Sequence, residues 1–82
     1  MDKDLLKLTN AKINKNYKIK KIECDIKLKR RLLELGLCKD TIIKIINISP
    51  LKNSFLLELR GFVLAVRKNC TDSIFVENCG NE

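Results

Sequence analysis

One short helix with its own start and stop signals constrains the fold of this chain more than any other feature. Leu28, Leu32 and Leu35 recur at the spacing of helical turns and form one apolar stripe, which predicts an amphipathic helix over residues 26–35. A helix of about ten residues is marginal alone in water and needs an apolar surface to pack on. The rest of the chain is therefore expected to form that surface.

Both ends of this helix carry residues that favour its termination. Asp25 is placed to act as the N-cap, because its side chain can accept hydrogen bonds from the first free N–H groups. Gly36 is predicted to end the helix in the left-handed conformation, which is least costly for a residue without a Cβ. Leu37 is then expected to fold back over Leu32, the hydrophobic contact that usually accompanies this ending.

The other regular segments are typical of short strands joined by turns. Alternating or β-branched apolar residues predict strands at residues 17–24, 41–48, 55–60, 62–67 and 74–76. The second of these contains five isoleucines on both of its faces, so it is expected to lie between the core and the helix. Arg60 and Gly61 are predicted to form the tight turn of a hairpin, and residues 68–73 a polar connection.

Smaller backbone irregularities are predicted as well. Tyr17 and Ile19 alternate with lysines but Ile22 falls out of step, which indicates a bulge near residues 20–21. Asn14 and Asp40 are candidates for left-handed residues within turns.

The number and length of these segments indicate the fold class. About five short strands in an 82-residue chain favour a mainly β fold, a small closed antiparallel barrel with one helix at about residues 26–35. The whole chain, residues 1–82, is expected to form a single domain that ends in a flexible tail at residues 78–82. The apolar runs are too short for a membrane span and the N-terminus lacks a signal-peptide core, so a cytoplasmic protein is expected.

The positive charge is concentrated in the first part of the chain. The net charge is +7, and residues 1–31 contain 11 of the 17 basic residues but 4 of the 10 acidic ones. Such a distribution suggests an anionic partner, although a solvated lysine-rich surface is the preferred interpretation. The chain has one Tyr, three Phe and no Trp, so it offers few residues for stacking on bases, and nucleic acid is a disfavoured partner.

The side chains that most catalytic sites need are missing. The sequence has no histidine, and its three glycines are too dispersed to form a phosphate-binding loop, so no enzyme activity is predicted. The four cysteines, Cys24, Cys38, Cys70 and Cys79, form no CxxC pair and are interpreted as reduced thiols. A metal site made of distant thiolates, or a lowered pKa of Cys24 ahead of the helix, is the less favoured interpretation.

Two segments carry a resemblance to a known family. Residues 30–37 read RRLLELGL and are followed by Thr41, and residues 60–67 read RGFVLAVR. Together with the strands between and after them, these motifs resemble the FeoA family of ferrous iron transport proteins over nearly the whole chain. The departures lie in turns, such as Lys39 and Asp40 where the family often has Pro-Gly.

The resemblance implies an SH3-like barrel and a cytoplasmic, non-enzymatic accessory protein that binds the cytoplasmic GTPase region of the FeoB ferrous iron transporter. It provides no metal ligands, so ferrous iron is left without assigned residues, and self-association stays open. A small basic barrel that binds nucleic acid is the alternative function. The residues expected to contact the partner are Lys29, Arg30, Arg31 and Arg60. The motif residues expected to have a structural role are Leu32, Leu35, Gly36, Leu37 and Gly61.

Overall fold

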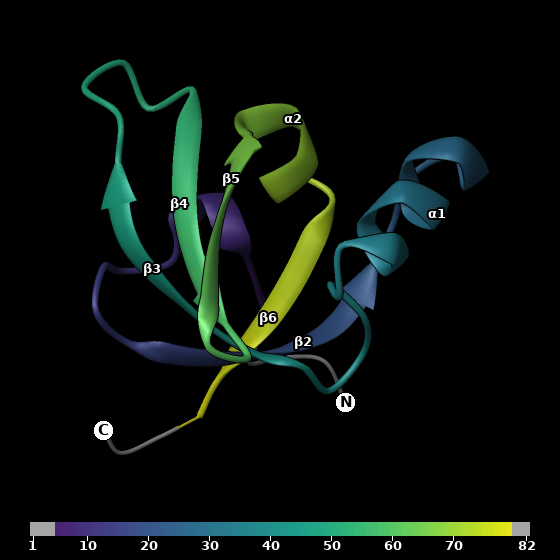
Figure 1. The fold of residues 1–82 in the computed structure, drawn as a ribbon, viewed down its shortest axis with the longest axis horizontal. Coiled ribbons are helices and arrows are strands. Elements are labelled where there is room, and N and C mark those ends of the chain that lie inside the picture. Colours follow the sequence, from purple (N-terminus) through teal and green to yellow (C-terminus); the bar gives the residue numbers. More distant parts are fainter. Residues whose placement is uncertain (1–4, 80–82) are drawn as a thin grey trace.

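Short strands and helices make up the computed structural model, which describes residues 5–79 (Figure 1). They follow one another as β1 (Leu6–Lys7), η1 (Leu8–Asn10, a 3-10 turn), β2 (Asn16–Ile22), α1 (Ile26–Glu34), β3 (Ile42–Ile48), β4 (Ser54–Leu59), β5 (Phe62–Arg67), α2 (Lys68–Thr71) and β6 (Ile74–Asn78). The predicted helix and the five predicted strands are therefore present, with small shifts in their ends.

All six strands belong to one antiparallel sheet with the order β1-β6-β2-β3-β4-β5. The sheet bends strongly, so that β4 and β5 cross over β2 and β6 (Figure 1). The mainly β fold with one predicted helix is confirmed. The sixth strand is β1, whose residues Leu6 and Lys7 pair with β6. Within residues 5–79 the two edge strands, β1 and β5, do not pair with each other, so the predicted closure of the barrel is not seen.

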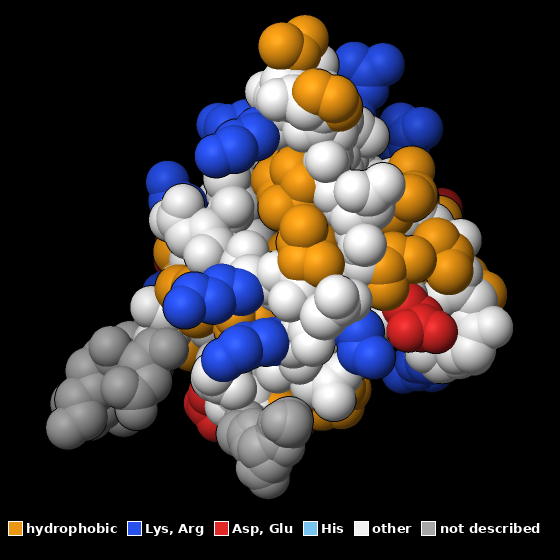
Figure 2. Space-filling view, turned by 90° about the vertical axis from the view of Figure 1, so that its left-hand side faces the viewer, with side chains coloured by type: hydrophobic (Ala, Val, Ile, Leu, Met, Phe, Trp, Pro, Cys, Tyr) orange, Lys and Arg blue, Asp and Glu red, His pale blue; other side chains and the backbone are white. Residues whose placement is uncertain are grey.

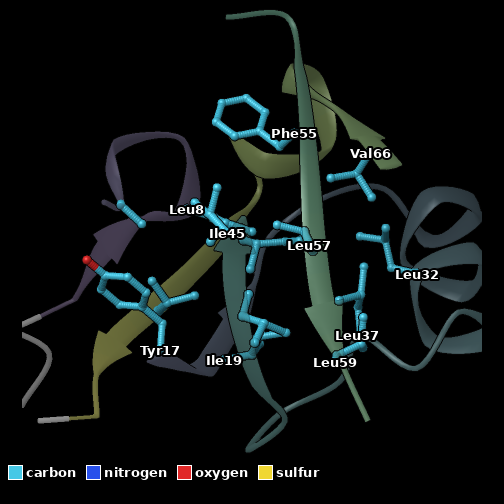
Figure 3. Close-up of a cluster of buried hydrophobic side chains, with 14 residues drawn as sticks. Leu8, Tyr17, Ile19, Leu32, Leu37, Ile45, Phe55, Leu57, Leu59 and Val66 are labelled. Carbon is cyan, nitrogen blue, oxygen red and sulfur yellow. The ribbon is translucent and has the colours of Figure 1, made fainter. Parts of the chain in front are cut away.

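The interior of the bent sheet holds the hydrophobic core. Inward-facing residues alternate along β3, β4 and β6, as a sheet with one buried face requires. Figure 3 shows these side chains converging between the strands and α1. The buried apolar residues are Leu8, Ala11, Tyr17, Ile19, Leu32, Leu37, Ile43, Ile45, Phe55, Leu57, Leu59, Val66, Ile74 and Val76.

The predicted turns and irregularities are present. Arg60 and Gly61 both have positive φ, +50° and +86°, which is the type I′ geometry that matches the twist of a two-residue hairpin. Asn14 and Asp40 also adopt the left-handed conformation, at φ +65° and +71°. The register of β2 against β6 shifts after Ile19, where the bulge was expected.

One prediction about packing is wrong. The outer face of β3 is not covered by α1, since Ile42 remains 43% exposed. Helix α1 lies instead beyond the edge of the sheet, with Leu32 close to Val66 of β5 (Figure 3). The polar connection predicted at residues 68–73 is present between β5 and β6, and it contains a helical turn, α2. In this turn the Asp72 N–H and the hydroxyl of the buried Thr71 both donate to the carbonyl of Lys68, at 2.8 and 3.0 Å.

A polar network fixes α2 to the N-terminal segment. The Thr9 hydroxyl donates to the Asp72 carboxylate at 2.6 Å, and its oxygen lies 2.7 Å from the hydroxyl oxygen of Thr71. Lys68 Nζ lies 3.1 Å from the other Asp72 oxygen. The hydrogen bond from Thr9, followed by that from Lys68, lowers the pKa of Asp72.

The end of the chain is partly ordered by β6. Asn78 is the last residue of this strand, and the Cys79 N–H donates to the carbonyl of Asn16 at 3.1 Å. Residues 80–82 of the predicted flexible tail lie outside the described residues.

Candidate partner-binding surface

The C-terminal end of α1 forms as its sequence predicts. The Gly36 N–H donates to the carbonyl of Leu33 at 3.0 Å, and the Leu37 N–H donates to that of Leu32 at 2.9 Å. These two bonds define the Schellman motif, and φ of Gly36 is +96°. A Cβ at Gly36 would meet only the Leu59 side chain, at an ordinary 3.7 Å, so the backbone conformation and not the space requires glycine here.

Helix α1 is held to the rest of the protein mainly by one side chain. Leu32 is 1% exposed and Leu28 is half-buried. Leu35, the C-cap, was predicted to share their buried stripe, but it is 44% exposed. Two further apolar residues of α1, Ile26 and Leu33, are 73% and 48% exposed. A nine-residue helix with this much apolar surface in water has room for another binding partner.

The exposed side of α1 is strongly basic. The helix contains four cations, Lys27, Lys29, Arg30 and Arg31, and a single carboxylate within its span. Within residues 5–79 none of these cations forms a salt bridge. Its first turn has no acidic residue, although carboxylates are favoured there and cations are not. The N-cap bond, from the Leu28 N–H to Asp25 Oδ1 at 3.3 Å, is the predicted stabilising contact at this end.

A groove separates α1 from β5 and α2. Its volume is about 360 Å³. Leu32 and Val66 both line it and lie near each other in Figure 3, and both are part of the core. Arg31 and Arg67 line it from opposite sides, and Cys70 of α2 lines its end. We call this hollow, lined by residues 28–35 of the helix and residues 65–70, the α1–β5 groove.

A second hollow, of about 480 Å³, lies on the other flank of α1. Ile22 and Leu33 supply its apolar lining. The lysines that surround it are Lys20, Lys21, Lys29 and Lys39. Lys20 is 3.8 Å from Asp40 and Lys21 is 2.9 Å from Glu23, so part of this charge is already balanced. Helix α1 thus stands between two hollows, both with basic residues in their lining.

The predicted partner-contact residues separate into two groups. Lys29, Arg30 and Arg31 lie together on α1, and the first and last of them line the two hollows. Arg60 lies at the β4–β5 turn and lines neither hollow.

Sequence reasoning missed two parts of this surface. Arg67 of the α1–β5 groove could not be found, because no local pattern relates residues 28–35 to residues 65–70. The exposed pair Ile26 and Leu33 did leave a signal, since apolar residues seven apart recur on one helix face outside the stripe that was recognised.

The cysteines give this surface no metal centre. Within residues 5–79 no group of three or more Cys, Asp or Glu side chains is arranged to hold a metal ion. Burial, followed by the neighbouring Asp25 carboxylate, raises the pKa of Cys24, so the expected state of this thiol is protonated. Cys38 Sγ lies 3.2 Å from the hydroxyl of the buried Thr41, which itself donates to the carbonyl of Gly36.

The opposite side of the molecule also exposes apolar groups. Figure 2 looks onto the side that faces away from α1, where hydrophobic side chains extend from top to bottom with Lys and Arg side chains beside them. Among the exposed apolar residues outside α1 are Ile13, Ile42 and Leu51. Neither described helix has the length and apolar character that crossing a bilayer requires.

The bent antiparallel sheet with one capped helix at its edge defines this protein as a small SH3-like β domain. A family model described as the FeoA domain matches residues 6–78. The chain therefore belongs to the FeoA family, whose members are non-enzymatic accessory proteins associated with ferrous iron transport. The absence of catalytic activity predicted from the sequence agrees with this family.

Solved structures of other FeoA proteins have the same fold. A FeoA-like protein from Clostridium acetobutylicum is 26% identical, with a TM-score of 0.85 over 96% of this chain and 92% of its own. Iron(II) transport protein A from Clostridium thermocellum is 25% identical, with a TM-score of 0.86 over 92% of this chain and 46% of its own. FeoA from Chlorobium tepidum is 23% identical, with a TM-score of 0.85 over 94% of this chain and 73% of its own. Curated protein sequences gave no match.

Proposed function

We propose that this protein is a cytoplasmic accessory protein of ferrous iron transport that binds the cytoplasmic GTPase region of a FeoB-type transporter. The single observation that carries the proposal is the surface of α1. This helix exposes Ile26 and Leu33 to solvent next to cations that have no salt-bridge partner within residues 5–79. A helix that served only to cover the core would bury its apolar residues.

The two kinds of side chain on α1 have different roles in this proposal. Lys29, Arg30 and Arg31 attract an acidic surface over a distance and raise the rate of association. Ile26 and Leu33 provide the desolvated contacts from which most binding free energy comes. Arg60, at the β4–β5 turn, contributes at the margin of the contact.

The remaining motif residues have a structural role. Leu32 and Leu37 belong to the core, and Gly36 and Gly61 adopt positive φ that their turns require. In this proposal the chain acts as one SH3-like domain over residues 1–82, and the tail at 78–82 takes no part in binding.

The direct test is a calorimetric titration with the purified cytoplasmic region of the cognate transporter, under reducing conditions, with and without guanine nucleotide. We expect binding, and we expect the double variant Lys29→Glu with Arg30→Glu to weaken it by about tenfold or more at low salt. The matched control is Lys12→Glu with Lys15→Glu, which changes the net charge equally at exposed lysines of the N-terminal loop. Equal weakening by both pairs would show that only net charge matters.

A second pair of variants separates the apolar contribution from the charge. Leu33→Ser removes an exposed side chain of α1, and Leu51→Ser removes one in the β3–β4 loop that is 83% exposed. We expect only the first to weaken binding. If the wild-type protein does not bind the transporter region in any of these conditions, the proposal is wrong. Salt-sensitive binding to single-stranded RNA in its place would support the nucleic-acid alternative.

A further inference from the structure

The strand β5 ends the sheet beside the α1–β5 groove. It pairs with β4 on one side, and within residues 5–79 no strand pairs with its other side. A free strand edge presents a row of unpaired N–H and C=O groups, and proteins commonly cover or interrupt such edges. Here the open α1–β5 groove lies next to the edge.

The register of the hairpin shows which backbone groups are free. The Lys68 N–H donates to the carbonyl of Asn53 at 3.0 Å. This bond lies just beyond the last cross-strand pair, Ser54 with Arg67, so these two residues form a non-hydrogen-bonded pair. Bonded and non-bonded pairs alternate along an antiparallel ladder. The N–H and C=O groups of Val63 and Ala65 therefore point away from β4. Neither residue makes a backbone hydrogen bond to another segment of residues 5–79.

The two faces of β5 differ in polarity. Val66 points inward to the core, whereas Val63, Ala65 and Arg67 are exposed on the outer face. A strand added to this edge would place alternate side chains in the same two directions. Its inward residues would enter the groove beside Leu28 and Leu35, which line it and are half-buried and 44% exposed, and its outward residues would lie beside Arg67. The geometry therefore favours a segment in which apolar and charged residues alternate.

The charge of the groove indicates the sign of that segment. Arg31 and Arg67 line it from opposite walls, and neither forms a salt bridge within residues 5–79. A second copy of this chain would bring its own arginines to the same place and would add to a net charge of +7 on each molecule. Carboxylates would instead form charge-assisted hydrogen bonds with these guanidinium groups.

We propose that the free edge of β5 binds an extended, acidic segment of a partner protein as an additional strand of the sheet, with its apolar residues in the α1–β5 groove. The inference rests on the proposed function only for the identity of the partner that supplies the segment. The mode of binding is strand addition, in which backbone hydrogen bonds provide affinity and alternate side chains provide selectivity.

A synthetic peptide of alternating glutamate and valine is the first probe, with ¹⁵N-labelled protein observed by NMR. We expect shifts of the amide signals of Val63, Ala65 and the residues of α1, and no binding by the peptide with lysine in place of glutamate. Backbone methylation then tests the mode directly. Methylating the peptide nitrogens on the bonded edge should abolish binding, whereas methylating the alternate nitrogens should preserve it. Equal effects of the two methylation patterns would overturn strand addition.

Variants of the protein give an independent test. Ala65→Pro removes the free N–H on an edge strand, where proline is tolerated, and Ala65→Thr keeps it at the same position. We expect the first to lose peptide binding and the second to retain it. Arg67→Glu should weaken binding by about tenfold, and Arg60→Glu, outside the groove, by less than about twofold. A fall in the sedimentation mass of the free protein on Ala65→Pro would show that a second copy occupies the edge, and would contradict the proposal.

The same variants separate this inference from the proposed function. If the transporter region binds the wild-type protein, and the acidic peptide binds the wild-type protein and Ala65→Pro equally well, strand addition is wrong and the proposed function stands. If the acidic peptide binds as described and the transporter region does not bind at all, strand addition stands and the proposed function is wrong.

Discussion

The bent sheet and helix α1 differ in how completely they use their apolar residues. Along β4, Phe55, Leu57 and Leu59 all lie in the core. Along α1, only Leu32 is buried, and Ile26 and Leu33 remain in water. The sheet therefore supplies most of the free energy of folding, and α1 retains apolar and basic surface that folding does not need. This difference suggests that the two regions can be changed separately.

The largest effect is expected in the sheet. Leu57→Ala removes a fully buried side chain of β4 and should lower the free energy of unfolding by about 3 kcal/mol, since it loses packing and leaves a cavity. The control is Leu51→Ala in the exposed β3–β4 loop, which should change it by less than about 0.5 kcal/mol. Urea denaturation measures both. Comparable losses would mean that the core lies elsewhere.

Leu32→Ala should have an intermediate effect of a different kind. It removes the main anchor of α1 and should cost about 2 kcal/mol, the low end for a buried leucine, because the site opens to the α1–β5 groove. Native-state hydrogen exchange should show fast exchange in α1 while the amides of β3 and β4 stay protected. Equal loss of protection in the sheet would show that helix and sheet unfold together, and the two regions would not be separable.

Gly36→Ala should act only through the backbone at the end of α1. Its φ of +96° is unfavourable for alanine, and the expected loss of stability is about 1–2 kcal/mol. Since a Cβ would make only an ordinary contact with Leu59, Gly36→Asn should cost less than alanine does. Thermal unfolding of the two variants provides the measurement. A larger loss for asparagine would point to crowding and not to conformation.

The local features of this protein could be predicted from its sequence because short-range interactions determine them. Asp25, Gly36 and the Arg60–Gly61 turn each act within a few residues, through a cap or a positive φ. The alternation of buried residues in β4 and the bulge in β2 are visible in the same way.

The features that sequence reasoning missed depend on distant residues. Helix α2 forms with the help of Thr71, whose hydroxyl contacts Thr9 at the other end of the chain. The exposure of Leu35 could not be predicted, because helical spacing shows which residues share a face but not how far another segment covers that face, and Leu35 lines the open α1–β5 groove. The α1–β5 groove likewise requires two segments separated by some thirty residues to be placed side by side.

The smallest expected effect concerns acid stability at α2. The pKa of Asp72 is lower in the folded protein than in the unfolded chain, whose carboxyl pKa is about 3.9. Its contribution to stability is therefore fully present above about pH 4 and is lost as the pH falls through the folded-state pKa. Thr9→Val removes the main cause and should flatten the dependence of thermal stability on pH below about 4. An unchanged pH profile would show that Thr9 does not stabilise the Asp72 carboxylate.

Hydrogen–deuterium exchange with and without the cytoplasmic region of the transporter tests the division between scaffold and binding surface most directly. Exchange can be measured separately for two sides of the molecule. Residues 26–35 and 62–67 represent the side of α1 and β5, and β3 with the β3–β4 loop represents the side shown in Figure 2. Added protection at residues 26–35 and 62–67, with β2 and β6 unchanged, is the predicted result. Protection confined to β3 and the β3–β4 loop would contradict the account.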